Sequence, residues 1–243
     1  MASITFLGTG ASVVTRSRKC SGILFEDKLI DVGFGVLANL LQSRTRLDSI
    51  NEVYISHTHS DHIGDFTGLI WAMAMENRTK TVRVVSSAST AETLAKILDL
   101  HSTPWPWLKF KIDFVRPEEV RLAYSKTIHD PETLAFRFET SKGDVVYGAD
   151  TAKSGRLARF CAGCELLIHD ATFLDGQEST AALTNHSTAR DAGSIAHEAK
   201  IGRLVLTHIS PGNEGADKSY ISQAASVFGG QIVVAKDHET IVL

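Results

Sequence analysis

Cysteine is scarce in this sequence of 243 residues, occurring only as Cys20, Cys161 and Cys164. So few cysteines, in an odd number, exclude a disulfide scaffold and favour a reducing compartment, so we expect a cytoplasmic protein. No apolar run approaches the roughly 18 residues of a transmembrane helix, so we expect no membrane partner. The N-terminus has no basic segment followed by an apolar one, and we expect no signal peptide.

Proline is also sparse, and three of the five prolines lie between residues 104 and 117. This stretch indicates an irregular connection containing one strand and not a linker, so we expect a single domain over residues 1–243. The net charge is −3, which argues against a protein that binds nucleic acid over its whole surface. A composition of 43% hydrophobic and 22% charged residues excludes intrinsic disorder.

The hydrophobic pattern alternates between short strands and helices. Strands are expected at residues 4–7, 22–25, 29–31, 52–56, 82–86, 110–114, 124–128, 134–139, 144–148, 166–169, 204–207, 232–234 and 241–243, and helices at 36–42, 66–77, 90–100, 154–160, 188–199 and 219–228. Ser187 or Thr188 is expected to cap the helix at 188–199. So many strands, with hairpin-like neighbours at 22–31 and 124–148, favour an α/β (α+β) sandwich of two sheets with helices on both outer faces.

The segment ISHTHSDH, residues 55–62, is the strongest chemical signal. His57 and His59 are two positions apart, so an extended backbone points both side chains the same way. Asp61 and His62 follow at the turn into the next element. Four potential ligands in six residues can serve two metal ions, and imidazole and carboxylate donors suit zinc best, with manganese or iron possible.

Three later segments share one design, an apolar or β-branched run that ends in a polar residue. The runs end at His129, Asp150 and His208. Strand ends meet at one edge of such a sandwich, so we expect these three side chains beside the segment at 55–62. The recurrence of the pattern carries this prediction, because a single histidine at a strand end is usually an ordinary surface residue.

The chain resembles the metallo-β-lactamase superfamily, and within it the ribonuclease Z branch. The matching strings are LGTGAS (7–12), IDVGFG (30–35), ISHTHSDHIGDF (55–66), IHDPETLAFRF (128–138), VVYGADT (145–151), LLIHDATF (166–173), NHSTARDAG (185–193) and LVLTHIS (204–210). The resemblance implies a four-layer αββα sandwich with two zinc ions at one edge. It implies that one zinc is held by His57, His59 and His129, the other by Asp61, His62 and His208, and that Asp150 bridges both.

The same resemblance implies a phosphodiesterase in which a hydroxide shared by the two metals attacks the phosphorus. Asp61 would aim this hydroxide, and His186 would donate a proton to the leaving alkoxide. We expect His169, Asp170 and Asp237 to orient ligand imidazoles. His101, His197 and His238 are expected to be ordinary residues, the loop at 8–12 a tight turn, and Cys161 and Cys164 buried free thiols.

Two departures from the branch bear on the substrate. Ribonucleases Z commonly insert a basic arm that grips tRNA, but His129 and Asp150 are only 21 positions apart, enough for a hairpin. We therefore expect no arm, and a small diester, a cyclic nucleotide or RNA as substrate in preference to tRNA. A basic set either lines the cleft or forms a solvated face, and it consists of Arg16, Arg18, Lys19, Arg44 and Arg46.

Two alternative functions remain open at this point. One is hydrolysis of a thioester, a lactone or a β-lactam on the same fold, and the other is a non-catalytic metal-binding scaffold. The setting of His186 in Asn-His-Ser-Thr favours phosphodiester chemistry over the first, and the complete ligand set favours an enzyme over the second. A homodimer is expected by resemblance to relatives.

Overall fold

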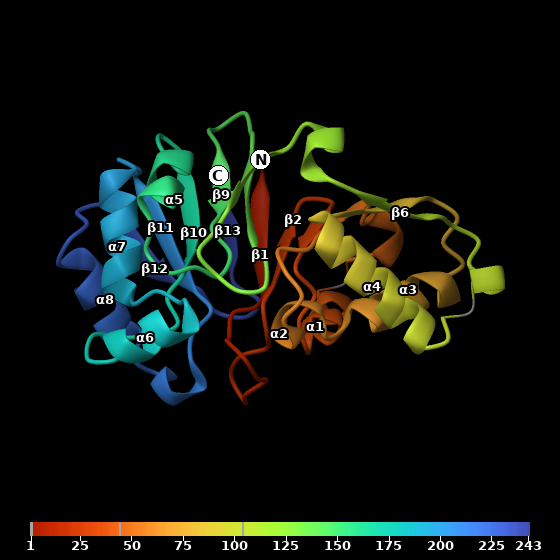
Figure 1. Ribbon diagram of the computed structural model, residues 1–243, viewed down its shortest axis with the longest axis horizontal. Helices are drawn as coiled ribbons and strands as arrows, with labels where there is room; N and C mark the ends of the chain where they lie inside the picture. Colours follow the sequence, from red (N-terminus) through yellow and green to blue (C-terminus); the bar gives the residue numbers. More distant parts are fainter. Residues whose placement is uncertain (1, 44, 104) are drawn as a thin grey trace.

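Two β-sheets stack face to face at the centre of the structure, a computed structural model that describes residues 2–43, 45–103 and 105–243. Helices cover the outer face of each sheet, and the two ends of the chain lie near each other (Figure 1). Arg44 and Pro104, which entered the sequence predictions, lie outside the described residues. Within the described ranges, no helix is long and apolar enough to cross a membrane.

The first sheet has the strand order β13-β1-β2-β3-β4-β5-β6. Strands β1, β2 and β3 pair antiparallel, whereas β3 to β6 are parallel to one another. The last strand of the chain pairs with the first, which places the two termini side by side. The strands are β1 (Ser3–Gly8), β2 (Gly22–Phe25), β3 (Lys28–Ile30), β4 (Glu52–Tyr54), β5 (Val82–Val85), β6 (Ile112–Val115) and β13 (Thr240–Val242).

The second sheet has the order β12-β11-β10-β9-β8-β7. Strands β9 to β12 are parallel, and β8 is antiparallel to both of its neighbours. Strand β7 therefore runs in the same direction as β9, β10 and β11, and these four strands have their carboxyl ends at the same edge. The strands are β7 (Ala123–Lys126), β8 (Leu134–Phe138), β9 (Val145–Tyr147), β10 (Leu166–Asp170), β11 (Arg203–Thr207) and β12 (Gln231–Val234).

Three apolar cores correspond to the three interfaces of a four-layer αββα sandwich. Phe6, Tyr54 and Phe136 belong to the core between the sheets. A second core packs the first sheet against α1, α3 and α4, and a third packs the second sheet against α5, α7 and α8. The helices are α1 (Val36–Gln42), α2 (Ser60–Ile63), α3 (Phe66–Met75), α4 (Ala88–Leu100), α5 (Gly155–Phe160), α6 (Glu178–Thr184), α7 (Ala189–Glu198) and α8 (Asp217–Ala225).

The predicted architecture is confirmed, with differences at the ends of elements. All the expected strands form, but the one expected at 110–114 is shifted to Ile112–Val115, and Phe110 lies outside it in the apolar core. Thr188 caps α7, as expected, by accepting from the amide of Asp191. The sequence analysis missed α2 and α6, because α2 has only four residues and α6 has a single buried position, Ala181, so neither shows an apolar face.

Candidate metal centre

Side chains from both sheets converge where the carboxyl ends of their strands meet. His57 follows β4, whereas His129, Asp150 and His208 follow β7, β9 and β11 of the second sheet. One group of potential donor atoms within 4.8 Å of one another comes from His57, His59, His129 and Asp150, and another comes from Asp61, His62 and His208. The structure thus brings together all seven residues that the sequence analysis selected, from positions as distant as 57 and 208.

Asp150 is the geometric centre of the cluster. Its Oδ2 lies 3.1 Å from Nε2 of His62 and 3.4 Å from Nε2 of His208. The same oxygen lies 3.6 Å from Nε2 of His57 and 3.9 Å from Nε2 of His129. One carboxylate oxygen therefore faces imidazoles of both groups.

Hydrogen bonds behind the cluster engage Nδ1 of four of its imidazoles and so turn Nε2 of each toward the centre. His57 donates from Nδ1 to Ser56 Oγ at 3.0 Å, and His129 donates from Nδ1 to the carbonyl of Asn185 at 3.1 Å. Nδ1 of His62 likewise bonds to a carboxylate, and Nδ1 of His208 bonds to a hydroxyl. A metal ion at the centre can then displace any proton on Nε2 and bind its lone pair, while Nδ1 keeps its proton and its partner.

The donor set fits a divalent cation. His57 Nε2 is fully buried and has no hydrogen-bond partner among the described residues. A buried nitrogen without a partner costs free energy, and a metal ion that accepts its lone pair would remove this cost. Neutral imidazoles combined with carboxylates are the ligands that zinc prefers, and Asp150 Oδ2 lies near imidazoles of both groups. These residues could therefore hold two ions.

Burial and neighbouring charge set the protonation of two central groups. Burial lowers the pKa of His57 well below its usual value, and the adjacent imidazole of His62 lowers it further, so His57 is neutral. Burial alone would raise the pKa of Asp150, but the imidazoles of His208 and His62 outweigh it and hold the pKa well below the usual range. A neutral imidazole and an ionised carboxylate are the forms that bind metals.

Asp31 supports the cluster from behind and was missed by the sequence analysis. Its Oδ2 accepts from Nδ1 of His62 at 2.8 Å, from Oγ of Ser56 at 2.8 Å and from the phenol of Tyr147 at 2.7 Å. Asp31 is fully buried, so each of these bonds is shielded from water. The string at 30–35 carried the family resemblance, yet the residues themselves gave no reason to assign Asp31 a role.

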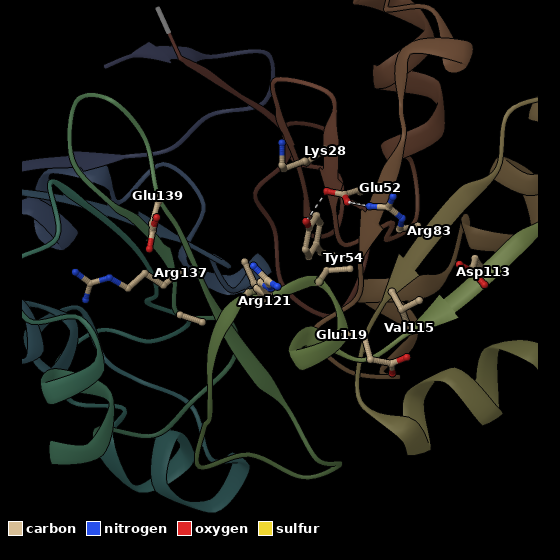
Figure 2. A pocket seen from close by; sticks show the side chains of 13 residues that line it. Lys28, Glu52, Tyr54, Arg83, Asp113, Val115, Glu119, Arg121, Arg137 and Glu139 are labelled. Carbon is tan, nitrogen blue, oxygen red and sulfur yellow. Dashed lines mark hydrogen bonds and ion pairs between the residues drawn. The ribbon is translucent and has the colours of Figure 1, made fainter.

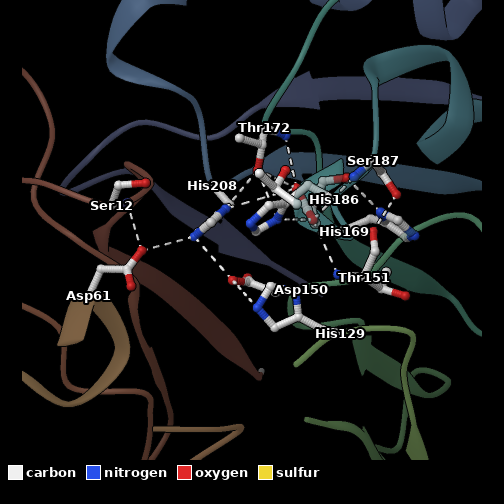
Figure 3. Close-up of polar contacts among 12 residues, drawn as sticks. Ser12, Asp61, His129, Asp150, Thr151, His169, Thr172, His186, Ser187 and His208 are labelled. Atoms are coloured by element: carbon white, nitrogen blue, oxygen red, sulfur yellow. Dashed lines mark hydrogen bonds and ion pairs between the residues drawn. The ribbon is translucent and has the colours of Figure 1, made fainter. Parts of the chain in front are cut away.

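Asp61 is aimed at the centre by its backbone surroundings. It lies in the first turn of α2, and its Oδ2 accepts from the amide of Ser12 at 2.6 Å, which is the role of the loop at 8–12 (Figure 3). Gly33 passes so close to this turn that a Cβ there would lie 2.0 Å from the carbonyl oxygen of Asp61. Only glycine permits this approach.

His186 lies beside the cluster and is held by Asp170. Its Nδ1 donates to Asp170 Oδ2 at 2.8 Å, and its ring stacks on that of His208 with centroids 5.1 Å apart (Figure 3). Burial lowers the pKa of His186, but the carboxylate of Asp170 outweighs it and raises the pKa to about 9. Asp170 also accepts from Thr172 Oγ1, which in turn accepts from Nδ1 of His208.

Comparisons with known proteins agree with this geometry. A family model described as "Beta-lactamase superfamily domain" matches residues 28–209. The chain belongs to the β-lactamase superfamily. Ribonuclease Z of Methanosarcina acetivorans is 26% identical over 300 residues, covering 98% of this chain and 96% of that protein. Ribonuclease Z of Saccharolobus solfataricus is 27% identical over 291 residues, covering 96% and 97%.

Solved structures of the superfamily share the fold over its full length. The metallo-beta-lactamase fold protein YhfI from Bacillus subtilis matches with a TM-score of 0.84 and 25% identity, covering 99% of this chain and 98% of that one. The short form of human tRNase Z matches with a TM-score of 0.80 and 21% identity, covering 99% and 98%. The predicted fold and the resemblance to ribonuclease Z are therefore confirmed, and the protein is a metal-dependent hydrolase of the β-lactamase superfamily.

Some predictions about residues around the candidate metal centre were wrong. Asp237 does not support a ligand imidazole; it accepts from Thr9 Oγ1 and from the amide of Lys19, and so braces the turn after β1. Arg18 neither lines the cleft nor faces solvent, because it is buried and donates to the carbonyl of Ala235. Arg16 and Arg46 are exposed.

Other predictions hold. His101, His197 and His238 are exposed, and the cysteines are buried free thiols. His169 differs from its prediction, because it does not contact a ligand imidazole and instead donates from Nδ1 to the carbonyl of Asp170.

A cavity of about 690 Å³ lies apart from the histidine cluster (Figure 2). Tyr54 and Val115 of the first sheet, Arg137 of the second sheet, and Glu139 just after β8 lie around it. Its remaining charged side chains carry both signs, and none of the seven clustered residues lines it. The chemistry therefore belongs to the histidine cluster and not to this cavity.

Proposed function

We propose that this protein is a dinuclear zinc-dependent phosphodiesterase of the ribonuclease Z type. The observation that carries the proposal is the position of Asp150 Oδ2 between two groups of imidazoles, with His186 beside them. Bound zinc ions would supply a hydroxide nucleophile at neutral pH and offset the charge that develops on the phosphate oxygens, and manganese or iron could do the same.

We assign three ligands to each ion and one to both. His57, His59 and His129 would hold the first ion, Asp61, His62 and His208 the second, and Asp150 both. The grouping of donor atoms supports this assignment, as does the unpaired Nε2 of His57.

Two residues would move or orient protons. Asp61, fixed by the amide of Ser12, would accept a hydrogen bond from the attacking water and direct it at the phosphorus. His186, fixed by Asp170, would present Nε2 to the leaving oxygen and donate its proton there, because the Nδ1 proton is already bound to the carboxylate. Asp170 is in this scheme the positioning residue of the acid.

RNA or a small diester is the substrate class that we propose, and not tRNA gripped by an arm. Relatives by sequence are ribonucleases Z, and one neighbour by fold is a diphosphatase of the PhnP family. Matches to ribonuclease Z extend over as many as 300 residues whereas this chain has 243, so those relatives carry additional segments. Between His129 and Asp150 this chain forms only β8, a turn and β9.

A screen of the zinc-loaded protein tests the proposal. We expect hydrolysis of bis-p-nitrophenyl phosphate and of short RNA, weak or no processing of precursor tRNA, and no hydrolysis of nitrocefin or of an aryl thioester. Turnover of the thioester or nitrocefin without turnover of any diester would favour the rival hydrolase. No turnover of any substrate with two zinc ions bound would favour a metal-binding scaffold.

Two broader predictions accompany the function. A homodimer is supported by exposed apolar side chains on α3 and after α4, among them Met75 and Trp107, both 74% exposed. Light scattering on the purified protein would measure its mass directly.

A cytoplasmic location stays a prediction, supported by three cysteines that are all free and buried.

A further inference from the structure

A groove of about 510 Å³ is lined by residues that directly precede His129 and closely follow Asp150 in the sequence. It is lined by the end of β7 and the two residues after it, the loop after β9, and α5. Four cationic side chains line it, and no carboxylate does: Lys126, Lys153, Arg156 and Arg159. This concentration of positive charge contrasts with the net charge of −3 for the whole chain.

The two arginines of the groove are available to a ligand. Arg156 and Arg159 are exposed and lie three positions apart on α5, which places them on the same face of the helix. Among the described residues, neither has a carboxylate within 4.0 Å. Each lysine has a carboxylate partner at the surface: Lys153 lies 3.9 Å from Glu198, and Lys126 is directly paired with Glu132. Exposed pairs of this kind contribute little free energy, so a phosphate can compete for the lysines.

The groove and the metal centre are parts of one hydrogen-bonded unit. Thr127 Oγ1 donates to the carbonyl of Asp150 at 2.8 Å, and the amide of Ala152 donates to the carbonyl of Ile128 at 2.9 Å. The loops that carry the groove thus also carry His129 and Asp150. The cations of the groove therefore lie on the loops that position two of the proposed ligands.

We propose that this groove binds the phosphate backbone of a single-stranded RNA next to the scissile phosphate, an inference that rests on the proposed function. The guanidinium groups of Arg156 and Arg159 would each hold a phosphate through paired N–H donors. Ile128 is 47% exposed between the lysines and the centre, and its side chain offers an apolar contact to a sugar or a base. The substrate is then a strand of several nucleotides and not an isolated diester.

Binding of a short single-stranded oligouridylate with phosphorothioate linkages, which resist hydrolysis, tests the groove without requiring turnover. We expect the charge-reversal variant R156E/R159E of the zinc-loaded protein to bind the fluorescein-labelled oligonucleotide at least tenfold more weakly, measured by anisotropy. Because each phosphate contact to a single strand contributes about 0.7 to the salt dependence, the slope of log K against log salt should fall in magnitude by about 1.4. Hydrolysis of bis-p-nitrophenyl phosphate, whose single phosphate cannot occupy the centre and the groove together, should be unchanged.

The matched control is K142E/K218E, which makes the same change in net charge at two exposed lysines that do not line the groove. Equal binding by the control and groove variants, or no binding by the wild type, would overturn the inference. Loss of bis-p-nitrophenyl phosphate hydrolysis in R156E/R159E, with its melting temperature unchanged, would also overturn it, because the arginines would then act at the centre. Failure of the wild type to hydrolyse any diester would reject the proposed function but leave the binding result readable.

Discussion

The phenol of Tyr147 donates a 2.7 Å hydrogen bond to the carboxylate of Asp31, from a position 116 residues away in the sequence. The two residues belong to opposite sheets, Tyr147 to β9 and Asp31 to the loop after β3. Since Asp31 also holds Nδ1 of His62, this bond ties the orientation of a proposed ligand to the packing of the two sheets.

Substitution of Asp31 should weaken metal binding although Asp31 is not itself a proposed ligand. We expect Asp31→Asn to reduce zinc affinity about 10–100-fold, because the amide no longer fixes His62 as a carboxylate does. Tyr147→Phe, which keeps the ring and removes one hydrogen bond, should have a smaller effect in the same direction. Competition with a zinc-binding dye gives both affinities, and unchanged values in both variants would remove Asp31 from this supporting role.

Removal of Asp150 should empty both positions together. One oxygen of Asp150 faces imidazoles of both groups, so Asp150→Ala is expected to reduce the metal content from two ions per chain to none. Elemental analysis after dialysis measures this content. Two ions retained per chain would contradict a shared carboxylate, and one retained ion would place Asp150 in a single site.

Replacement of His186 should slow cleavage while the metals stay bound. As the proposed proton donor, His186 should contribute about 10²–10⁴-fold to the rate, most for substrates with poor leaving groups. The comparison is His186→Ala on an alkyl ester and on a p-nitrophenyl ester of phosphate, with metal content measured in parallel. If both esters slow equally, His186 does not act as the acid.

Chelation should lower the thermal stability of the protein. Metal binding by the native fold alone adds about 2.7 kcal/mol when the free ion is at 100 times its dissociation constant, which is roughly 5–10 °C for a chain of this size. Differential scanning calorimetry with and without a chelator measures the shift, and re-addition of zinc should restore it. Equal melting temperatures would indicate that the histidine cluster holds no metal.

Most of the architecture could be predicted from the sequence, because strand periodicity and the segment at 55–62 are local signals. The convergence of His129, Asp150 and His208 followed from a general rule about strand ends, and the structure places them together. The roles of Asp31 and Arg18 could not be predicted, since both depend on partners far along the chain. A buried arginine is indistinguishable in the sequence from a surface one.

The direction shared by β7, β9, β10 and β11 has a consequence for assembly. The donors that follow these strands reach one point only after pairings between remote parts of the polypeptide are complete, including contact across the two sheets. The donors extend from residue 57 to residue 208, so tight retention of zinc would report that the strands across this span have reached their native topology.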